Sequence, residues 1–127
     1  RWSLIIIRDV FIGRNTYTEF LKSPEKISTN VLVDRIKKLR EYELLGFRKD
    51  KIDRKIKYYY LTDMGISLYP ILTEMSLWTK KNFPTLPTHK LAQETFLDID
   101  KLGIDLHNTK VIDTYTEKRE ALFKETL

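Results

Sequence analysis

Apolar residues recur along the first third of the chain at the spacing of short helices. Residues 2–11 are apolar nearly all round, which predicts a buried helix, although the β-branched run at 5–7 also suits a core strand. A shorter helix is predicted over residues 17–22. Asn15 or Thr16 is its candidate N-cap, and Glu19 follows Thr16 by three residues, as in a capping box.

A third amphipathic segment begins after the turn-forming sequence Ser-Pro-Glu at residues 23–25, and Ser28 is its expected N-cap. On a helical wheel one face is apolar and is expected to dock on the first two helices; it carries Leu32, Ile36 and Leu39. The opposite face is expected to point outward and carries Asn30, Val33, Asp34 and Lys37. Gly46 is expected to end this helix or the turn that follows it.

Two strands are predicted next, at about 45–51 and 55–61, with charged residues concentrated around the tip between them. The tyrosines at 58–60 alternate across the second strand, so one face is expected to pack and the other to stay partly wet. Thr62 then caps a long helix predicted over 63–82. Its apolar stripe exceeds what the small preceding core can cover, so we expect this helix to pair two copies of the chain. The stripe is Leu68, Leu72, Met75 and Trp78.

The remaining residues predict a helical extension. Phe-Pro-Thr-Leu-Pro at 83–87 is a rigid linker, because neither proline continues a helix comfortably. Amphipathic segments at about 88–102 and 109–125 follow, and Gly103 separates them into a helical hairpin. The predicted fold class is therefore mainly α with a small β-hairpin (α+β), ending in a C-terminal helical extension.

Length and charge bound the domain organisation and the partner. At 127 residues the chain has room for one domain with an appendage, assigned to 1–83 and 84–127. A composition of 42% apolar and 32% charged residues argues against disorder. The formal net charge is +5, but residues 1–83 hold 17 Lys/Arg against 10 Asp/Glu, and the extension holds 6 against 8. The positive field therefore lies on the first unit, where it favours an anionic partner.

Several protein classes are excluded by what the chain lacks. It has no cysteine, hence no disulfide or thiolate nucleophile, and no apolar run long enough to span a membrane. The cytoplasm is the expected compartment. The sequence opens at Arg1 without a methionine and apparently inside a helix, which suggests residues upstream and limits the cysteine count to this stretch.

The chain offers little for catalysis. His89 and His107 lie 18 residues apart, without cysteines or a carboxylate at metal-ligand spacing, and each is expected to be an exposed or capping residue. The sequence has no glycine-rich phosphate loop and no Gly-x-Ser-x-Gly elbow. Asp98 and Asp100 are interpreted as a solvated helix face. We therefore expect no enzyme, no metal and no cofactor.

A helix led by small polar residues can enter a DNA major groove, and a cationic hairpin beside it can grip phosphates. The helix candidates are Ser28, Thr29, Asn30, Val33, Asp34, Lys37 and Lys38, and the hairpin candidates are Arg48, Lys49, Lys51, Arg54, Lys55 and Lys57. Each set alone also fits an ordinary solvated surface; their succession favours a winged helix-turn-helix. Asn30 suits adenine and Val33 a thymine methyl, whereas Asp34 suits either cytosine or a pair with Lys38. Base stacking by the tyrosine run is less favoured than packing.

Several motifs resemble those of HxlR-type winged-helix regulators. They are the opening Trp2-Ser3-Leu4-Ile5-Ile6-Ile7-Arg8-Asp9, the second-helix segment Tyr17-Thr18-Glu19-Phe20, the stretch from Ile27-Ser28 to Leu39, and Tyr59-Tyr60-Leu61-Thr62-Asp63-Met64-Gly65 with Leu68-Tyr69-Pro70-Ile71-Leu72. The similarity covers about residues 1–83. It implies bacterial or archaeal transcription regulators that bind operators as homodimers.

The chain departs from the family pattern in four places. Asp53-Arg54-Lys55 stands where the family's wing carries prolines, and Glu43-Leu44 replaces the usual Asp-Gly or Asn-Gly after the recognition helix. The cysteine that some members carry near the N-terminus has no counterpart here. The segment 84–127 is longer than the family pattern predicts.

Three functions follow from these features. The favoured one is a sequence-specific, homodimeric regulator that binds a double-stranded DNA operator. The second is a winged-helix protein-interaction module that no longer reads DNA. The third is a regulator that responds to a small-molecule effector, bound between the long helix and residues 84–127.

Overall fold

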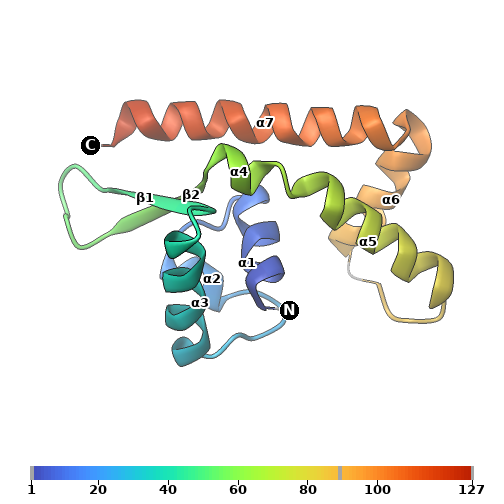
Figure 1. Cartoon of the computed structure of the whole chain (residues 1–127), viewed down its shortest axis with the longest axis horizontal. Coiled ribbons are helices and arrows are strands. Elements are labelled where there is room, and N and C mark those ends of the chain that lie inside the picture. Colours follow the sequence, from blue (N-terminus) through green and yellow to red (C-terminus); the bar gives the residue numbers. More distant parts are fainter. Residues whose placement is uncertain (1, 89, 127) are drawn as a thin grey trace.

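The computed structural model describes residues 2–88 and 90–126. Along these residues the elements are α1 (Trp2–Phe11), α2 (Tyr17–Leu21), α3 (Thr29–Glu41), β1 (Leu45–Lys49), β2 (Lys57–Leu61), α4 (Asp63–Ile66), α5 (Tyr69–Asn82), α6 (Lys90–Leu102) and α7 (Ile104–Glu125). Figure 1 shows α1–α3 on one side of the hairpin and α4, and α7 running along the other side. The prediction of a mainly helical chain with one antiparallel hairpin is confirmed.

Three predicted N-caps are present. Thr16 accepts the backbone N–H of Glu19 at 3.2 Å, and the Glu19 carboxylate accepts from the Thr16 hydroxyl, also at 3.2 Å. Ser28 accepts the N–H of Val31 at 3.4 Å, and Thr62 accepts the N–H of Gly65 at 3.1 Å. Each cap satisfies a backbone donor that has no partner inside its helix, so these starts were predictable from local sequence.

The prediction that Gly46 ends the third helix or the turn after it is wrong on both counts. The helix ends at Glu41, and Glu43 makes the turn with a φ of 61°. Gly46 lies inside β1, directly opposite Tyr60. A Cβ at Gly46 would lie 2.5 Å from the Tyr60 ring, so the glycine is needed because that ring covers the strand.

The predicted single helix over 63–82 is wrong: two helices, α4 and α5, meet at Ser67 and Leu68. Pro70 explains the break, because proline has no N–H to donate and its ring clashes with the carbonyl four residues earlier. Instead, Pro70 lies in the first turn of α5, where its missing donor costs nothing.

Smaller differences concern the element ends. The strands stop at Lys49 and resume at Lys57, so the tip is longer than predicted. Gly103, with a φ of 85°, separates α6 from α7 as expected. However, α7 begins directly after it, at Ile104, rather than near residue 109.

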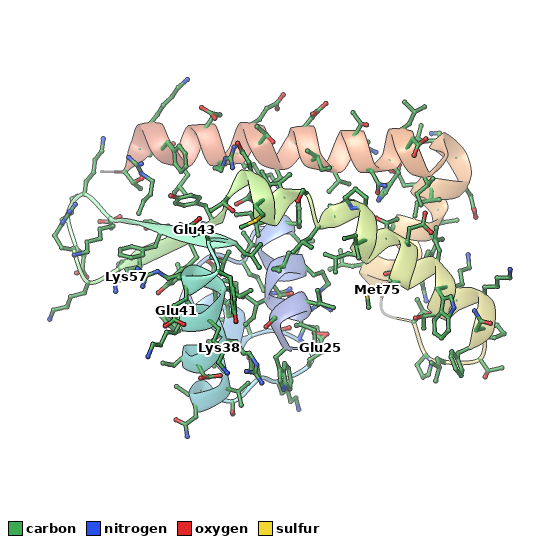
Figure 2. All side chains as sticks on the ribbon, in the orientation of Figure 1. Glu25, Lys38, Glu41, Glu43, Lys57 and Met75 are labelled. Atoms are coloured by element: carbon green, nitrogen blue, oxygen red, sulfur yellow. The ribbon has the colours of Figure 1, made fainter. Side chains whose placement is uncertain are left out.

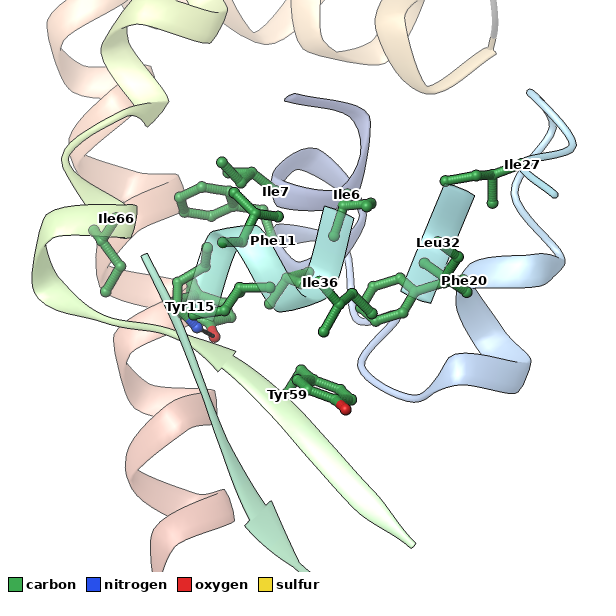
Figure 3. Close-up of a cluster of buried hydrophobic side chains, with 14 residues drawn as sticks. Ile6, Ile7, Phe11, Phe20, Ile27, Leu32, Ile36, Tyr59, Ile66 and Tyr115 are labelled. Carbon is green, nitrogen blue, oxygen red and sulfur yellow. Dashed lines mark hydrogen bonds between the residues drawn. The ribbon is translucent and has the colours of Figure 1, made fainter. Parts of the chain in front are cut away.

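The core lies where α1, α2, α3 and the hairpin meet. Its largest fully buried side chains are Tyr59, Phe20, Ile6, Ile7, Leu32, Ile36, Leu61 and Val10. The predicted inner face of α3 is therefore buried. Figure 3 shows that Tyr115, from α7, reaches into the same cluster. The C-terminal helix thus shares a core with residues before the linker.

Candidate nucleic-acid interface

The outward face of α3 has the exposure that the sequence predicted. Its seven candidate side chains are all exposed: Ser28, Thr29, Asn30, Val33, Asp34, Lys37 and Lys38. Figure 2 marks Lys38 on this helix and Lys57 on the neighbouring hairpin. Val33, an apolar side chain on this face, is 48% exposed. The helix therefore offers a small polar and apolar surface whose side chains are available to a partner.

Asp34 is paired within the helix. Its carboxylate accepts from Arg35 at 2.9 Å and lies 3.3 Å from the Lys38 ammonium. The sequence left two interpretations of Asp34, a contact with cytosine or an ion pair with Lys38. The structure contains the ion pair. Exposed pairs of this kind are weak, so the pair would open at little cost if a base competed for either side chain.

The base of the wing is tied to the end of α3 through Phe47. The Arg40 guanidinium lies 4.4 Å from the centre of the Phe47 ring, and the Lys57 ammonium lies 4.7 Å from it. Each cation is attracted to the electron-rich ring face. Arg40 was not among the sequence candidates, yet this shared ring places a cation of α3 beside a cation of the hairpin.

The tip of the wing is shaped by two aspartates. Asp50 accepts the N–H groups of Ile52 at 3.0 Å and Asp53 at 2.9 Å, and the Tyr58 hydroxyl at 3.1 Å. These hydrogen bonds hold the pKa of the Asp50 carboxyl below its ordinary value, the bond from Asp53 contributing most. Asp53 in turn accepts the N–H of Lys55 at 3.1 Å. Side-chain turns therefore order a tip that has no proline.

Five of the six predicted wing cations lie along the strand ends and tip. Lys51, Arg54 and Lys55 are exposed at the tip, and Lys49 and Lys57 are half-buried where the strands end. Arg48 differs from them. Its guanidinium donates to the Thr126 hydroxyl at 3.0 Å and to the Thr126 carbonyl at 3.3 Å, and lies 4.7 Å from the centre of the Phe123 ring. The structure thus directs Arg48 toward the C-terminal helix.

The four predicted dimer residues divide into two pairs. Leu68 and Leu72 are half-buried and pack against the chain's own core. Met75 and Trp78, further along α5, are 49% and 61% exposed. The Trp78 ring lies 5.8 Å from that of Phe83, and the apolar surface continues through the linker at Leu86. The exposed apolar area is therefore centred later on the helix than the sequence stripe suggested.

A polar network joins α5, α6 and α7. Contrary to expectation, His107 is buried, with 3% of its surface exposed. One of its ring nitrogens lies 2.6 Å from the Asp98 carboxylate and the other 2.9 Å from the Tyr69 hydroxyl. The Asp98 carboxylate also accepts from Lys110 at 2.9 Å, so it belongs to this network rather than to a solvated face. Its pKa is lowered, chiefly by the hydrogen bond with His107.

A cavity of about 440 Å³ opens beside this network. Its walls come from α1, α5, α6 and α7, and include Phe11, Leu72, Ala92, Phe96 and Val111.

In the described part of the chain, no three potential metal ligands lie together. His89 lies outside the described residues. No described helix is both long and apolar enough to cross a membrane.

The family model of HxlR-like helix-turn-helix proteins matches residues 1–87. The chain belongs to this family. That range ends in the linker, so α6 and α7 lie beyond it. Among curated proteins, no match to the chain was found.

Solved structures of regulators share this fold. PA1607, described as a candidate transcription factor, is 30% identical with a TM-score of 0.62, over 70% of this chain and 63% of its own. The reduced form of the transcriptional regulator YodB from B. subtilis is 26% identical with a TM-score of 0.56, over 68% of this chain and 85% of its own. The matched region thus spans less than two-thirds of PA1607.

The likeness in fold also reaches the C-terminal helices. The transcriptional regulator SlyA, at 17% identity, matches 90% of this chain and 76% of its own with a TM-score of 0.57. A match of that extent includes residues beyond the linker. The chain therefore shares its fold with SlyA beyond the linker as well as before it.

Proposed function

We propose that the chain is a sequence-specific DNA-binding transcriptional regulator that acts as a homodimer. One observation supports the proposal: α3, with its exposed outer face, is joined to the cationic wing where Arg40 and Lys57 lie over the same Phe47 ring. A helix of this kind fits the major groove while the adjacent hairpin reaches the phosphate backbone. Membership of the HxlR-like family supports the same conclusion.

In this proposal the exposed residues of α3 recognise bases. Asn30 suits a bidentate contact to adenine, and Val33 suits the methyl group of thymine. Lys37 and Lys38 are long enough to reach guanine or phosphate. Ser28 has its hydroxyl committed to the helix N-cap, so it contributes mainly by fixing where the helix begins. Sequence preference would therefore depend chiefly on Asn30 and Val33.

The wing would contribute affinity for DNA of any sequence rather than preference for particular bases. Lys51, Arg54 and Lys55 are exposed at a tip that Asp50 holds in one shape. Each phosphate contact releases counterions from DNA, so binding would weaken steeply as salt is raised. Lys49 and Lys57 lie at the strand ends, nearer α3, and would extend the same contact along the backbone.

Dimer formation would cover the apolar surface of α5 and the linker. Met75, Trp78, Phe83 and Leu86 are each about half exposed or more. Met75, Phe83 and Leu86 also line an open groove whose wall includes Leu4 and Ile5 of α1. Burying such area stabilises association by roughly 25 cal/mol per Å². Two-fold pairing would also double the DNA contacts and place two recognition helices about one helical turn apart.

Sedimentation and DNA binding together test the proposal. The wild-type chain should sediment as a dimer at micromolar concentration and bind mixed-sequence duplex DNA with a steep salt dependence. Trp78→Asp should yield folded monomers that bind more weakly, whereas Ile52→Asp, at a wing residue that is 94% exposed, should leave assembly unchanged. A folded wild-type monomer would contradict the dimer. Absence of DNA binding at moderate salt would instead favour a protein-interaction module.

The cavity favours a second candidate, a regulator that responds to a compact apolar molecule. Its walls combine apolar side chains such as Phe11, Leu72 and Phe96 with charged ones such as Arg14 and Lys118, and its volume is in the range that small ligands occupy. Ala92 lines both this cavity and the adjoining groove, so Ala92→Trp should fill part of the space. A ligand from a panel of small aromatic compounds should raise the unfolding temperature of the wild type but not of this variant.

A further inference from the structure

We propose that α7 is the element that positions the wing for DNA. The C-terminal half of this helix, from Tyr115 onward, covers one face and one edge of the hairpin and holds it at a fixed orientation to α3. This inference rests on the proposed DNA-binding function and adds residues to it that lie beyond the family match. Figure 1 shows α7 passing alongside the hairpin as far as the C-terminus.

The hairpin has two faces with different neighbours. The pairs Leu45–Leu61 and Phe47–Tyr59 lie on the face that packs on the core and α3. The alternate pairs, Gly46–Tyr60 and Arg48–Tyr58, lie on the other face. There the Tyr60 ring meets the Phe123 ring of α7 edge-on, with centroids 4.8 Å apart and planes at 81°. The wing is thus packed between the core and α7.

The outer edge of β2 is also bound by α7. The Leu61 N–H donates to the Tyr115 hydroxyl at 2.7 Å, and Arg119 donates to the Leu61 carbonyl at 2.9 Å and to Asp63 at 2.7 Å. These side chains satisfy backbone groups that in a larger sheet would face another strand. Two residues earlier on the same edge, the Tyr59 N–H donates to the Asn15 carbonyl at 2.8 Å. The edge is therefore fixed at two successive outward-facing N–H groups.

Arg48 and Thr126 make the contact nearest the tip. Thr126 is buried, accepts from Arg48 and donates its own hydroxyl hydrogen to the Leu122 carbonyl at 2.7 Å. The Arg48 guanidinium lies over the Phe123 ring. The Arg48 guanidinium and the Thr126 hydroxyl are thus both held in place by further contacts. An arginine that the sequence assigns to phosphate binding instead joins the wing to α7.

These contacts have a consequence for DNA binding because an isolated two-stranded hairpin is only marginally stable. A wing held in one orientation gives up less conformational entropy when it meets phosphates, so its cations contribute more to affinity. Lys51, Arg54 and Lys55 are exposed at the tip, and the Arg54 guanidinium donates within the wing, to the Asp50 carbonyl at 3.4 Å. The proposed effect of α7 on DNA binding is therefore an effect on the orientation of the hairpin that carries these cations.

Phe123→Ala tests this role, since it removes no charge. Its affinity for a mixed-sequence duplex of about 30 bp, roughly three helical turns, should fall about tenfold. Its salt dependence should also flatten by about one unit for each phosphate contact that the wing no longer makes. A loss of stability alone would lower affinity without changing that slope. Thr126→Val, a smaller change that removes the Arg48 acceptor hydroxyl, should act in the same direction, and Thr109→Ala, at an exposed site of α7, should have no effect.

A double-mutant cycle with Lys55→Ala makes the test decisive. If α7 positions the wing, Lys55→Ala should cost much less affinity in the Phe123→Ala background than in the wild type. Equal losses in the two backgrounds, with an unchanged salt slope, would overturn the proposal.

Hydrogen exchange of the free chain separates this proposal from the function on which it rests. In Phe123→Ala the amides of Tyr58 to Leu61 should exchange faster, while those of the buried face of α3 should not change. If the wild type binds no duplex, the proposed DNA-binding function is wrong. Hydrogen exchange then still tests, without DNA, whether α7 orders the wing. Exchange that rises equally in both elements, or in neither, would overturn the positioning role.

Discussion

The Tyr60 ring lies across Gly46, its partner on the opposite strand, and meets Phe123 of the last helix edge-on at 4.8 Å. This relationship joins three parts of the chain that are distant in sequence. A glycine in β1 makes room for an aromatic ring in β2, and that ring carries the contact with α7. The orientation of the wing therefore depends on a residue whose only contribution is the absence of a side chain.

Substitution of Gly46 should destabilise the chain through Tyr60. In Gly46→Ala the added Cβ would lie 2.5 Å from atoms at the far end of the Tyr60 side chain, so the ring must shift from its present position. Overpacking of this kind costs about 1–3 kcal/mol of unfolding free energy, measurable by urea denaturation. The cost should be smaller in a Tyr60→Ala background, and equal costs in both backgrounds would show that the ring is not the cause.

Loss of a tip cation should weaken DNA binding without changing base preference. Arg54→Ala or Lys55→Ala removes one charge from an exposed position, so the salt slope should flatten by about one unit per lost contact and all sequences should be affected alike. Fluorescence anisotropy across a salt titration measures both quantities. If the slope is unchanged in either variant, that residue makes no phosphate contact.

Truncation of Asn30 should change preference rather than overall affinity for DNA. The residue is exposed in the first turn of α3. Loss of a bidentate contact to a base costs about 1–3 kcal/mol at the base pair concerned, so Asn30→Ala should relax selection at one or two positions. Selection of binding sites from a random library gives the result. The same consensus at the same stringency would remove Asn30 from base recognition.

Acid should weaken the contact between α1 and the turn before α3. Arg8 donates to the Glu25 carboxylate at 2.7 and 2.9 Å, and this pairing lowers the pKa of Glu25 to about 2. Because the folded-state pKa is depressed, the stabilisation is complete above pH 4.5 and is lost as pH falls toward 2. Partial exposure to solvent limits it to roughly 1 kcal/mol. Unfolding free energies of wild type and Glu25→Gln, measured over that range, should converge at the acid end.

The elements that sequence predicted well are those set by neighbouring residues. Thr16, Ser28 and Thr62 cap their helices through bonds that span three residues, and the inner face of α3 follows from helical periodicity. The exposed face opposite was predictable for the same reason. The break before Pro70 was also encoded locally, but the apolar stripe across it favoured a continuous helix.

The contacts that sequence missed join residues far apart. The Leu61 N–H and the Tyr115 hydroxyl are separated by 54 positions, and Arg48 and Thr126 by 78. The sequence around an arginine in a basic hairpin is the same whether its side chain binds phosphate or the end of a helix. The sequence likewise predicts an exposed or capping His107, because the partners that bury it, Tyr69 and Asp98, belong to other helices. Only the packing of α7 distinguishes these cases.

Selection of genomic fragments by the wild-type chain, followed by sequencing of the bound DNA, tests whether a homodimer reads DNA through α3. We expect one enriched motif made of two inverted half-sites centred about one helical turn apart, roughly 10 bp, because a two-fold pair would present one α3 to each half-site. Fragments recovered without any common motif, or a motif with a single half-site, would contradict a homodimer that reads DNA through α3.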